Sequence, residues 1–67
     1  AYLKVDSSLI RDIHVSNEQQ TIVRGMATLC HSLGIQVIAE GVSTPEELES
    51  LFRAGVDGAT GPGVRLS

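Results

Sequence analysis

The chain lacks most of the features that stabilise very small proteins. Among its 67 residues there is one cysteine, Cys30, so no disulfide can form within the chain. A lone thiol is typical of a reducing, cytoplasmic setting. His14 and His31 lie far apart and no second cysteine accompanies them, which predicts no zinc site. Without such a link, a core of this size supplies only about 3–5 kcal/mol.

Basic residues, aromatic rings and long apolar runs are also scarce. The net charge is -3, and the chain has one Tyr, one Phe and no Trp. This composition predicts no groove for DNA or RNA, because such a groove needs a basic patch and rings for base stacking. No apolar run is long enough to cross a membrane, and Lys4 and Asp6 interrupt the first apolar stretch. We therefore expect neither a membrane segment nor a signal peptide.

What is present is typical of a globular chain, with 42% hydrophobic and 19% charged residues. Residues 2–6, Tyr-Leu-Lys-Val-Asp, predict a short strand. Residues 7–13 are ambiguous, with Ser7 or Ser8 as the candidate cap of one helical turn. The first clear helix must therefore begin after this segment.

That helix is predicted over residues 17–33. Ser16 and Gln19 have the spacing of a capping box, in which each side chain bonds the other's backbone N–H. Gly34 can adopt the left-handed conformation that ends a helix. The apolar residues recur at helical spacing and predict one buried stripe, made of Ile22, Val23, Met26, Leu29, Cys30 and Leu33.

The second half of the chain repeats the order of strand and helix. Residues 35–39 are almost entirely apolar, which is typical of a parallel strand covered on both faces. A helix follows, ending at Gly55, with a predicted buried stripe of Leu48, Leu51 and Phe52. Its start carries a second capping box, with Thr44 as the cap, Pro45 at the first helical position and Glu47 as the returning side chain.

A third short strand is predicted over residues 56–61, and residues 62–67 are predicted to form a loop. The order βαβαβ indicates an α/β fold with parallel strands and crossover helices. The two crossover helices of this order can cover only one face of a three-stranded sheet. We therefore infer a fragment of a barrel, or a chain that covers its bare face by self-association.

Candidate functional residues lie at the carboxyl ends of the predicted strands, where barrel enzymes place their active sites. Lys4 and Asp6 alternate along the first strand and share one face, and Glu40 ends the second strand. A lysine within a buried sheet needs a partner. Spacing alone slightly favours a structural ion pair of Lys4 with Asp6 or Glu40 over a catalytic role.

The residues around these positions resemble a known family. Tyr2-Leu3-Lys4-Val5-Asp6 is similar to the lysine strand of EAL domains, and the segment 37–42, Val-Ile-Ala-Glu-Gly-Val, to their next strand and loop. The Thr-Pro-Glu-Glu-Leu opening at 44–48 fits the helix that follows, and residues 51–59 resemble the run before the family's last strand. The resemblance covers essentially the whole chain, 1–67, as the C-terminal part of such a domain.

The resemblance implies the last three β/α units of a TIM-like (β/α)8 barrel that hydrolyses cyclic di-GMP to pGpG with Mg²⁺ or Mn²⁺. Lys4 matches the lysine that contacts the attacking water, and Glu40 matches the loop glutamate that assists the water or organises the metals. Asp6 matches a supporting aspartate. The substrate-side loop positions are Gly41, Ser43, Thr60 and Gly61.

Three positions depart from the family pattern. Ser43 stands where a second loop glutamate is usual, Thr60 where a glutamine is usual, and Pro62 where an aromatic ring is common. A hydroxyl group cannot replace the charge of the missing glutamate. These departures favour the alternative of a degenerate, non-catalytic domain that acts as a cyclic di-GMP receptor or protein-interaction module.

The family's metal ligands precede the lysine strand, and none of them is in this chain. The resemblance therefore implies that the isolated chain binds no catalytic metal and has no activity. A generic α/β fragment with no role in nucleotide chemistry is the remaining alternative.

Overall fold

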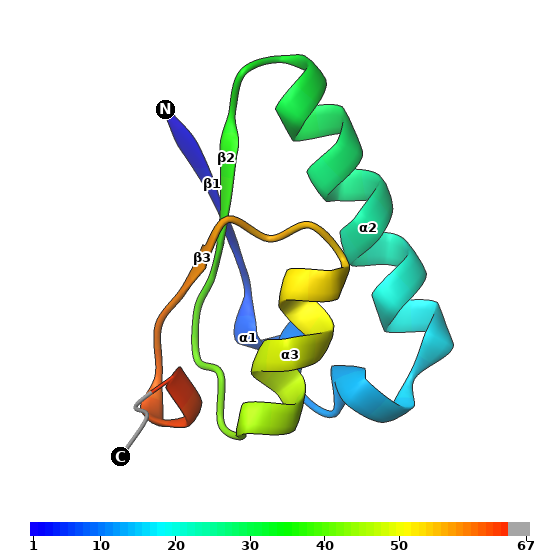
Figure 1. Ribbon diagram of the computed structural model, residues 1–67, viewed down its shortest axis with the longest axis vertical. Coiled ribbons are helices and arrows are strands. Elements are labelled where there is room, and N and C mark those ends of the chain that lie inside the picture. The colour runs from blue at the N-terminus through cyan, green and yellow to red at the C-terminus, as the bar shows by residue number, and fades with distance from the viewer. Residues whose placement is uncertain (65–67) are drawn as a thin grey trace.

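The computed structural model describes residues 1–64, which form a three-stranded sheet and the helices that cover it (Figure 1). The elements follow the order β1 (Tyr2–Val5), α1 (Ser7–Ile10), the 3₁₀ turn η1 (Ile13–Val15), α2 (Asn17–Ser32), β2 (Gln36–Ala39), α3 (Pro45–Arg53), β3 (Gly58–Ala59) and the 3₁₀ turn η2 (Pro62–Val64). No helix in the described part of the chain is long and apolar enough to span a membrane.

The sheet has the order β1-β2-β3 with both pairs parallel, which confirms the predicted α/β fold. Leu3 pairs with Val37, Val5 with Ala39, and Ala39 in turn with Ala59. Helices α2 and α3 lie on the same side of the sheet, and the carboxyl ends of the strands point to the lower edge of Figure 1. The functional residues expected at strand ends therefore share one edge.

The hydrophobic core lies between the sheet and the helices. It includes Val5, Val37 and Ala39 from the strands, with Val23 and Leu51 from the helices, and each of these is at most 1% exposed. On the first strand, Tyr2 is 58% exposed and the Lys4 side chain 54% exposed. One face of the sheet is thus covered and the other is bare, as predicted from the number of helices.

Strand β1 ends one residue earlier than predicted, because Asp6 leaves the strand to cap α1. Its Oδ2 accepts a hydrogen bond from the backbone N–H of Ser8 at 2.9 Å. The prediction that Ser7 or Ser8 caps this turn is therefore wrong. Hydrogen bonds from Ser8 hold the pKa of Asp6 below its ordinary value of 3.8, since they favour the charged carboxylate.

The capping box of α2 is half confirmed. Ser16 Oγ accepts from the backbone N–H of Gln19 at 3.2 Å, as predicted. The side chain of Gln19 does not return to Ser16; its Nε2 donates to the carbonyl oxygens of Leu9 at 2.9 Å and Arg11 at 2.8 Å. An amide can donate as well as accept, and here it donates to the carbonyls exposed where α1 ends.

The predicted buried stripe of α2 is wrong on one flank. Val23 and Cys30 are buried, whereas Ile22, Leu29 and Leu33 are 44%, 62% and 66% exposed. Phe52 on α3 is likewise 50% exposed. The core therefore covers only part of the predicted stripe of each helix, with Met26 and Leu48 partly buried at its border.

The remaining boundaries shift by a few residues. Helix α2 ends at Ser32, with Leu33 as its C-cap, and Gly34 has the predicted left-handed conformation at φ 74°. The third strand is limited to Gly58–Ala59, because only these two residues pair with β2, opposite Ile38 and Ala39. Residues 62–64 form a 3₁₀ turn in place of the predicted loop, and the rest of that predicted loop lies outside the described residues.

Hydrogen bonds of Asp57 hold the segment before β3 against β2 and α2. Val37 N–H donates to its Oδ2 at 2.7 Å, Asp57 N–H donates to the Val37 carbonyl at 2.8 Å, and His31 Nε2 lies 2.7 Å from the same Oδ2. The hydrogen bond from Val37, followed by the one from His31, lowers the pKa of Asp57 from its ordinary value of 3.8.

This lowered pKa makes the fold sensitive to acid. Because Asp57 binds its proton less readily in the folded chain, its carboxylate stabilises the fold above the unfolded value of 3.8, and the contribution is lost as the pH falls through the lower folded value. We expect Asp57→Asn to reduce stability at neutral pH and to flatten the decline of stability below about pH 4. Urea unfolding followed by circular dichroism at a fixed protein concentration measures both changes.

Glu49→Gln is the matched control, because Glu49 forms an exposed i,i+4 pair with Arg53 at 3.5 Å. It should leave the acid limb of the profile unchanged. An Asp57→Asn profile that runs parallel to that of the unmodified chain would assign the acid sensitivity to other carboxylates.

Candidate functional site

Lys4 and Glu40 come together at the carboxyl edge of the sheet. Glu40 directly follows β2, and its N–H donates to the Val5 carbonyl at 3.2 Å, which extends the β1–β2 ladder by one step. This step brings Glu40 Oε2 to 3.6 Å from Lys4 Nζ. Lys4 Nζ also lies 5.8 Å from the centre of the Tyr2 ring. Strand pairing therefore creates the contact that the sequence pattern only suggested.

The pair is open to solvent, with 54% of the Lys4 side chain and 46% of the Glu40 side chain exposed. An ion pair this exposed contributes only about 0–1 kcal/mol to stability. Both groups can be reached by a ligand at the strand ends. Chemically, the pair offers a point cation that suits a phosphate and a carboxylate that can accept a proton.

The loops that follow β2 and β3 are joined by backbone hydrogen bonds. Val42 N–H donates to the Thr60 carbonyl at 2.9 Å, and Gly63 N–H donates to the Val42 carbonyl at 2.8 Å. A Cβ on Gly61 would lie 2.5 Å from Val42 backbone atoms, and its φ of 126° disfavours any other residue. The structure thus places Gly41, Thr60 and Gly61 beside Glu40 in one pair of loops.

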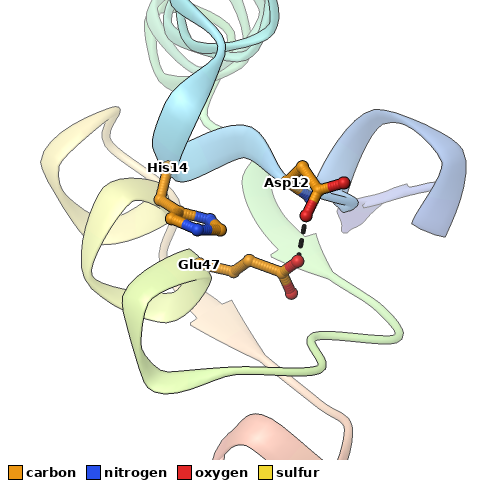
Figure 2. Close-up of side chains that lie close together, drawn as sticks. All are labelled: Asp12, His14 and Glu47. Carbon is orange, nitrogen blue, oxygen red and sulfur yellow. Dashed lines mark hydrogen bonds between the residues drawn. The ribbon is translucent and has the colours of Figure 1, made fainter.

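Ser43 lies in the same loop but faces a different partner. Its backbone N–H donates to Glu47 Oε1 at 2.8 Å, and Asp12 N–H donates to Glu47 Oε2 at 2.9 Å (Figure 2). Thr44 Oγ1 accepts from Glu47 N–H at 3.2 Å, which confirms Thr44 as the cap of α3. The capping box predicted that the Glu47 side chain accepts a hydrogen bond from Thr44 N–H. Its carboxylate instead accepts from Ser43 N–H and Asp12 N–H, and so links the loop after β2 to the segment after α1.

Sequence patterns identify Glu47 only as part of a helix cap. Its hydrogen bond with Asp12 could not be predicted, because the two residues lie 35 positions apart in the sequence. It is the one buried charged residue among those described, at 2% exposure. Burial raises its pKa, but hydrogen bonds from Asp12, Ser43 and Thr44 and the charge of His14 outweigh burial and hold the pKa below 4.5. The carboxylate therefore stays ionised inside the fold.

Asp6 does not join the Lys4–Glu40 pair within hydrogen-bond or ion-pair distance in residues 1–64. Its carboxylate is engaged with Ser8 at the start of α1. Asp6 follows the last residue of β1, Val5, with an extended backbone, and the supporting role predicted for it stays a prediction.

Comparisons with known proteins match nearly the whole described part of the chain. A model of the EAL domain matches residues 1–64. The blue light- and temperature-regulated antirepressor BluF of Escherichia coli is 42% identical over 55 residues, which cover 82% of this chain and 14% of BluF. The cyclic di-GMP phosphodiesterase PdeR of the same organism is 36% identical over 55 residues, 82% of this chain and 8% of PdeR.

Among solved structures, the manganese and cyclic di-GMP complex of Klebsiella pneumoniae BlrP1 superposes with a TM-score of 0.85 and 46% identity. The match covers 88% of this chain and 15% of BlrP1. This chain therefore spans about one seventh or less of these relatives (at most 15%). The three parallel strands correspond to part of a TIM-barrel-like domain. On these matches, the chain belongs to the EAL domain family.

Proposed function

We propose that this chain is the C-terminal part of a domain that hydrolyses cyclic di-GMP to pGpG, with Lys4 and Glu40 in its active site. The observation that carries the proposal is the 3.6 Å contact between Lys4 Nζ and Glu40 Oε2 at the carboxyl edge of parallel strands. Barrel enzymes build their sites at this edge. The family membership and the relative named as a cyclic di-GMP phosphodiesterase support the choice of substrate.

In this proposal the two side chains have complementary roles. The Lys4 ammonium favours the negative charge that develops on the attacked phosphate. Glu40 accepts the proton of the attacking water or organises the groups that hold it. Gly41, Ser43, Thr60 and Gly61 line the adjacent loops, where the backbone bonds between residues 42 and 60 hold them in place.

The described residues at this edge do not fit a divalent metal by themselves. The Glu40 carboxylate is paired with an ammonium group and the Asp6 carboxylate caps α1, whereas Mg²⁺ and Mn²⁺ prefer several oxygen ligands. When bound in a complete domain, such metals activate water and neutralise phosphate charge. That chemistry must be held mainly by ligands from elsewhere in the domain.

We therefore expect no turnover from the 67-residue chain alone. The test is incubation with cyclic di-GMP and excess Mn²⁺, followed by chromatography, with a full-length EAL protein that carries this chain as the positive arm. Turnover by the full-length protein and none by the chain supports the proposal. Production of pGpG by the pure chain contradicts the requirement for further metal ligands.

A second function is favoured by Ser43 and Thr60. A serine at position 43 places no carboxylate next to Val42 in the loop after Glu40, and its backbone N–H donates to Glu47. A domain altered in this way can retain cyclic di-GMP binding without hydrolysis and act as a receptor or interaction module. Binding of cyclic di-GMP by the full-length protein with no release of pGpG would select this alternative.

A further inference from the structure

Asp12, His14 and Glu47 form a cluster that shares no residue with the Lys4–Glu40 pair. One potential ligand atom from each lies within 4.8 Å of the others. Figure 2 shows the His14 ring, from η1, turned toward the carboxylates of Glu47 on α3 and of Asp12. Asp12 has a left-handed backbone at φ 60°, and this turn brings residues 12 and 14 over the start of α3.

The His14 ring gives an independent sign that a partner belongs in this cluster. Its Nδ1 is the one buried side-chain nitrogen or oxygen in residues 1–64 that has no hydrogen-bond partner. Buried polar atoms in folded proteins are nearly always satisfied, and an exception points to a bound water or ion. Histidine is also the commonest metal ligand in proteins and can bind through either ring nitrogen.

The charge around the cluster points to a cation. Glu47 is 2% exposed, and its hydrogen-bond donors, Asp12 N–H and Ser43 N–H, are neutral. In the described part of the chain, neither Asp12 nor Glu47 forms an ion pair. A buried carboxylate beside a second carboxylate and an imidazole is stabilised by a positive charge placed between them.

We propose that Asp12, His14 and Glu47 bind a divalent transition-metal ion, for which Zn²⁺ is the best match. Zinc accepts a mixed set of imidazole nitrogen and carboxylate oxygen, and three protein ligands leave a fourth position for water. Mg²⁺ and Ca²⁺ prefer all-oxygen sets and fit this cluster less well. None of these three residues is proposed to act on cyclic di-GMP, and the metal proposal does not depend on that activity.

The geometry requires a movement of side chains. In a tetrahedral zinc site, ligand atoms at about 2.0–2.2 Å from the ion lie about 3.3–3.6 Å from one another. Separations of up to 4.8 Å must therefore shorten by about 1.2–1.5 Å. The Asp12 side chain can make this movement because residue 12 is exposed, and its exposure also gives the ion a path from solvent.

Metal binding here would link two connections of the barrel fragment. Asp12 and His14 belong to the connection after α1, whereas Glu47 holds the loop after β2 through Ser43 N–H. An ion on the same carboxylate would add a second link to the one made by Asp12 N–H. The metal therefore acts as a structural clamp on this connection.

The test is isothermal titration of the metal-free 67-residue chain with ZnCl₂, at a concentration where circular dichroism shows the folded helices. We expect binding of one zinc per chain and a loss of affinity of at least about tenfold in His14→Ala and in Asp12→Asn, since even outer-shell partners of a metal are worth about 10–100-fold. These two side chains are exposed or half-buried, so both variants should fold. Backbone amide shifts on adding zinc should centre on residues 12–14 and 43–47.

His31→Ala and Cys30→Ser are the matched controls, because His31 pairs with Asp57 and Cys30 is a buried thiol. Both should bind zinc as the unmodified chain does. The proposal is overturned if zinc fails to bind at millimolar concentration, or if His14→Ala retains full affinity. It is also overturned if either control abolishes binding, since the ion would then sit at residues 30–31.

Discussion

Replacing Glu40 with glutamine in an active full-length EAL protein that carries this chain should lower kcat for cyclic di-GMP by about 10²–10⁴ and leave substrate affinity nearly unchanged. Glutamine keeps the shape of the side chain and leaves an oxygen beside the Lys4 ammonium group, which lies 3.6 Å from Glu40 Oε2. It cannot accept a proton at neutral pH. The substitution should therefore slow the hydrolysis step, which needs a base or an organised metal site, and should affect binding little.

Steady-state hydrolysis and equilibrium binding, measured on the same preparation, separate the two effects. Glu49→Gln supplies the control, since it makes the same chemical change at an exposed position on α3. It should leave both kcat and affinity unchanged. An unaltered kcat in Glu40→Gln would reduce the Lys4–Glu40 pair to a surface ion pair with a structural role only.

The parts of this fold that depend on local patterns were predictable from the sequence. Ser16 and Thr44 cap their helices as their spacing from Gln19 and Glu47 predicted. Each cap is a contact between residues three positions apart, so a short window of sequence contains both partners. The parallel order of strands likewise followed from the alternation of strand and helix.

The rest depended on partners that are distant in the sequence. The side chain of Glu47 bonds Asp12, and the pattern around residue 47 contains no sign of residue 12. Whether Leu29 is buried depends on what packs beside α2, because helical periodicity gives the apolar face and not its cover. For the candidate site, Lys4 and Glu40 were identified by position, but their contact required the register of β1 against β2.

The exposed apolar residues beside α2 and on the bare face of the sheet predict that the isolated chain self-associates. Ile22 and Leu29 on α2 and its C-cap Leu33 are between 44% and 66% exposed, and Tyr2 on the bare face of the sheet is 58% exposed. Apolar surfaces and unpaired strand edges of this kind recruit other chains. We expect a dimer or larger assembly whose folded state depends on protein concentration.

Analytical ultracentrifugation across a dilution series, with circular dichroism at each point, measures mass and folding together. If the chain folds only on dimerisation, each tenfold dilution removes about 1.4 kcal/mol of stability. Leu29→Lys should shift the assembly toward higher concentration, because it places a charge in the exposed stripe of α2. Val15→Lys is the control, since Val15 is 75% exposed but lies in η1, outside that stripe. A folded monomer at the lowest concentration would mean that one covered face of a three-stranded sheet is enough to hold this fold.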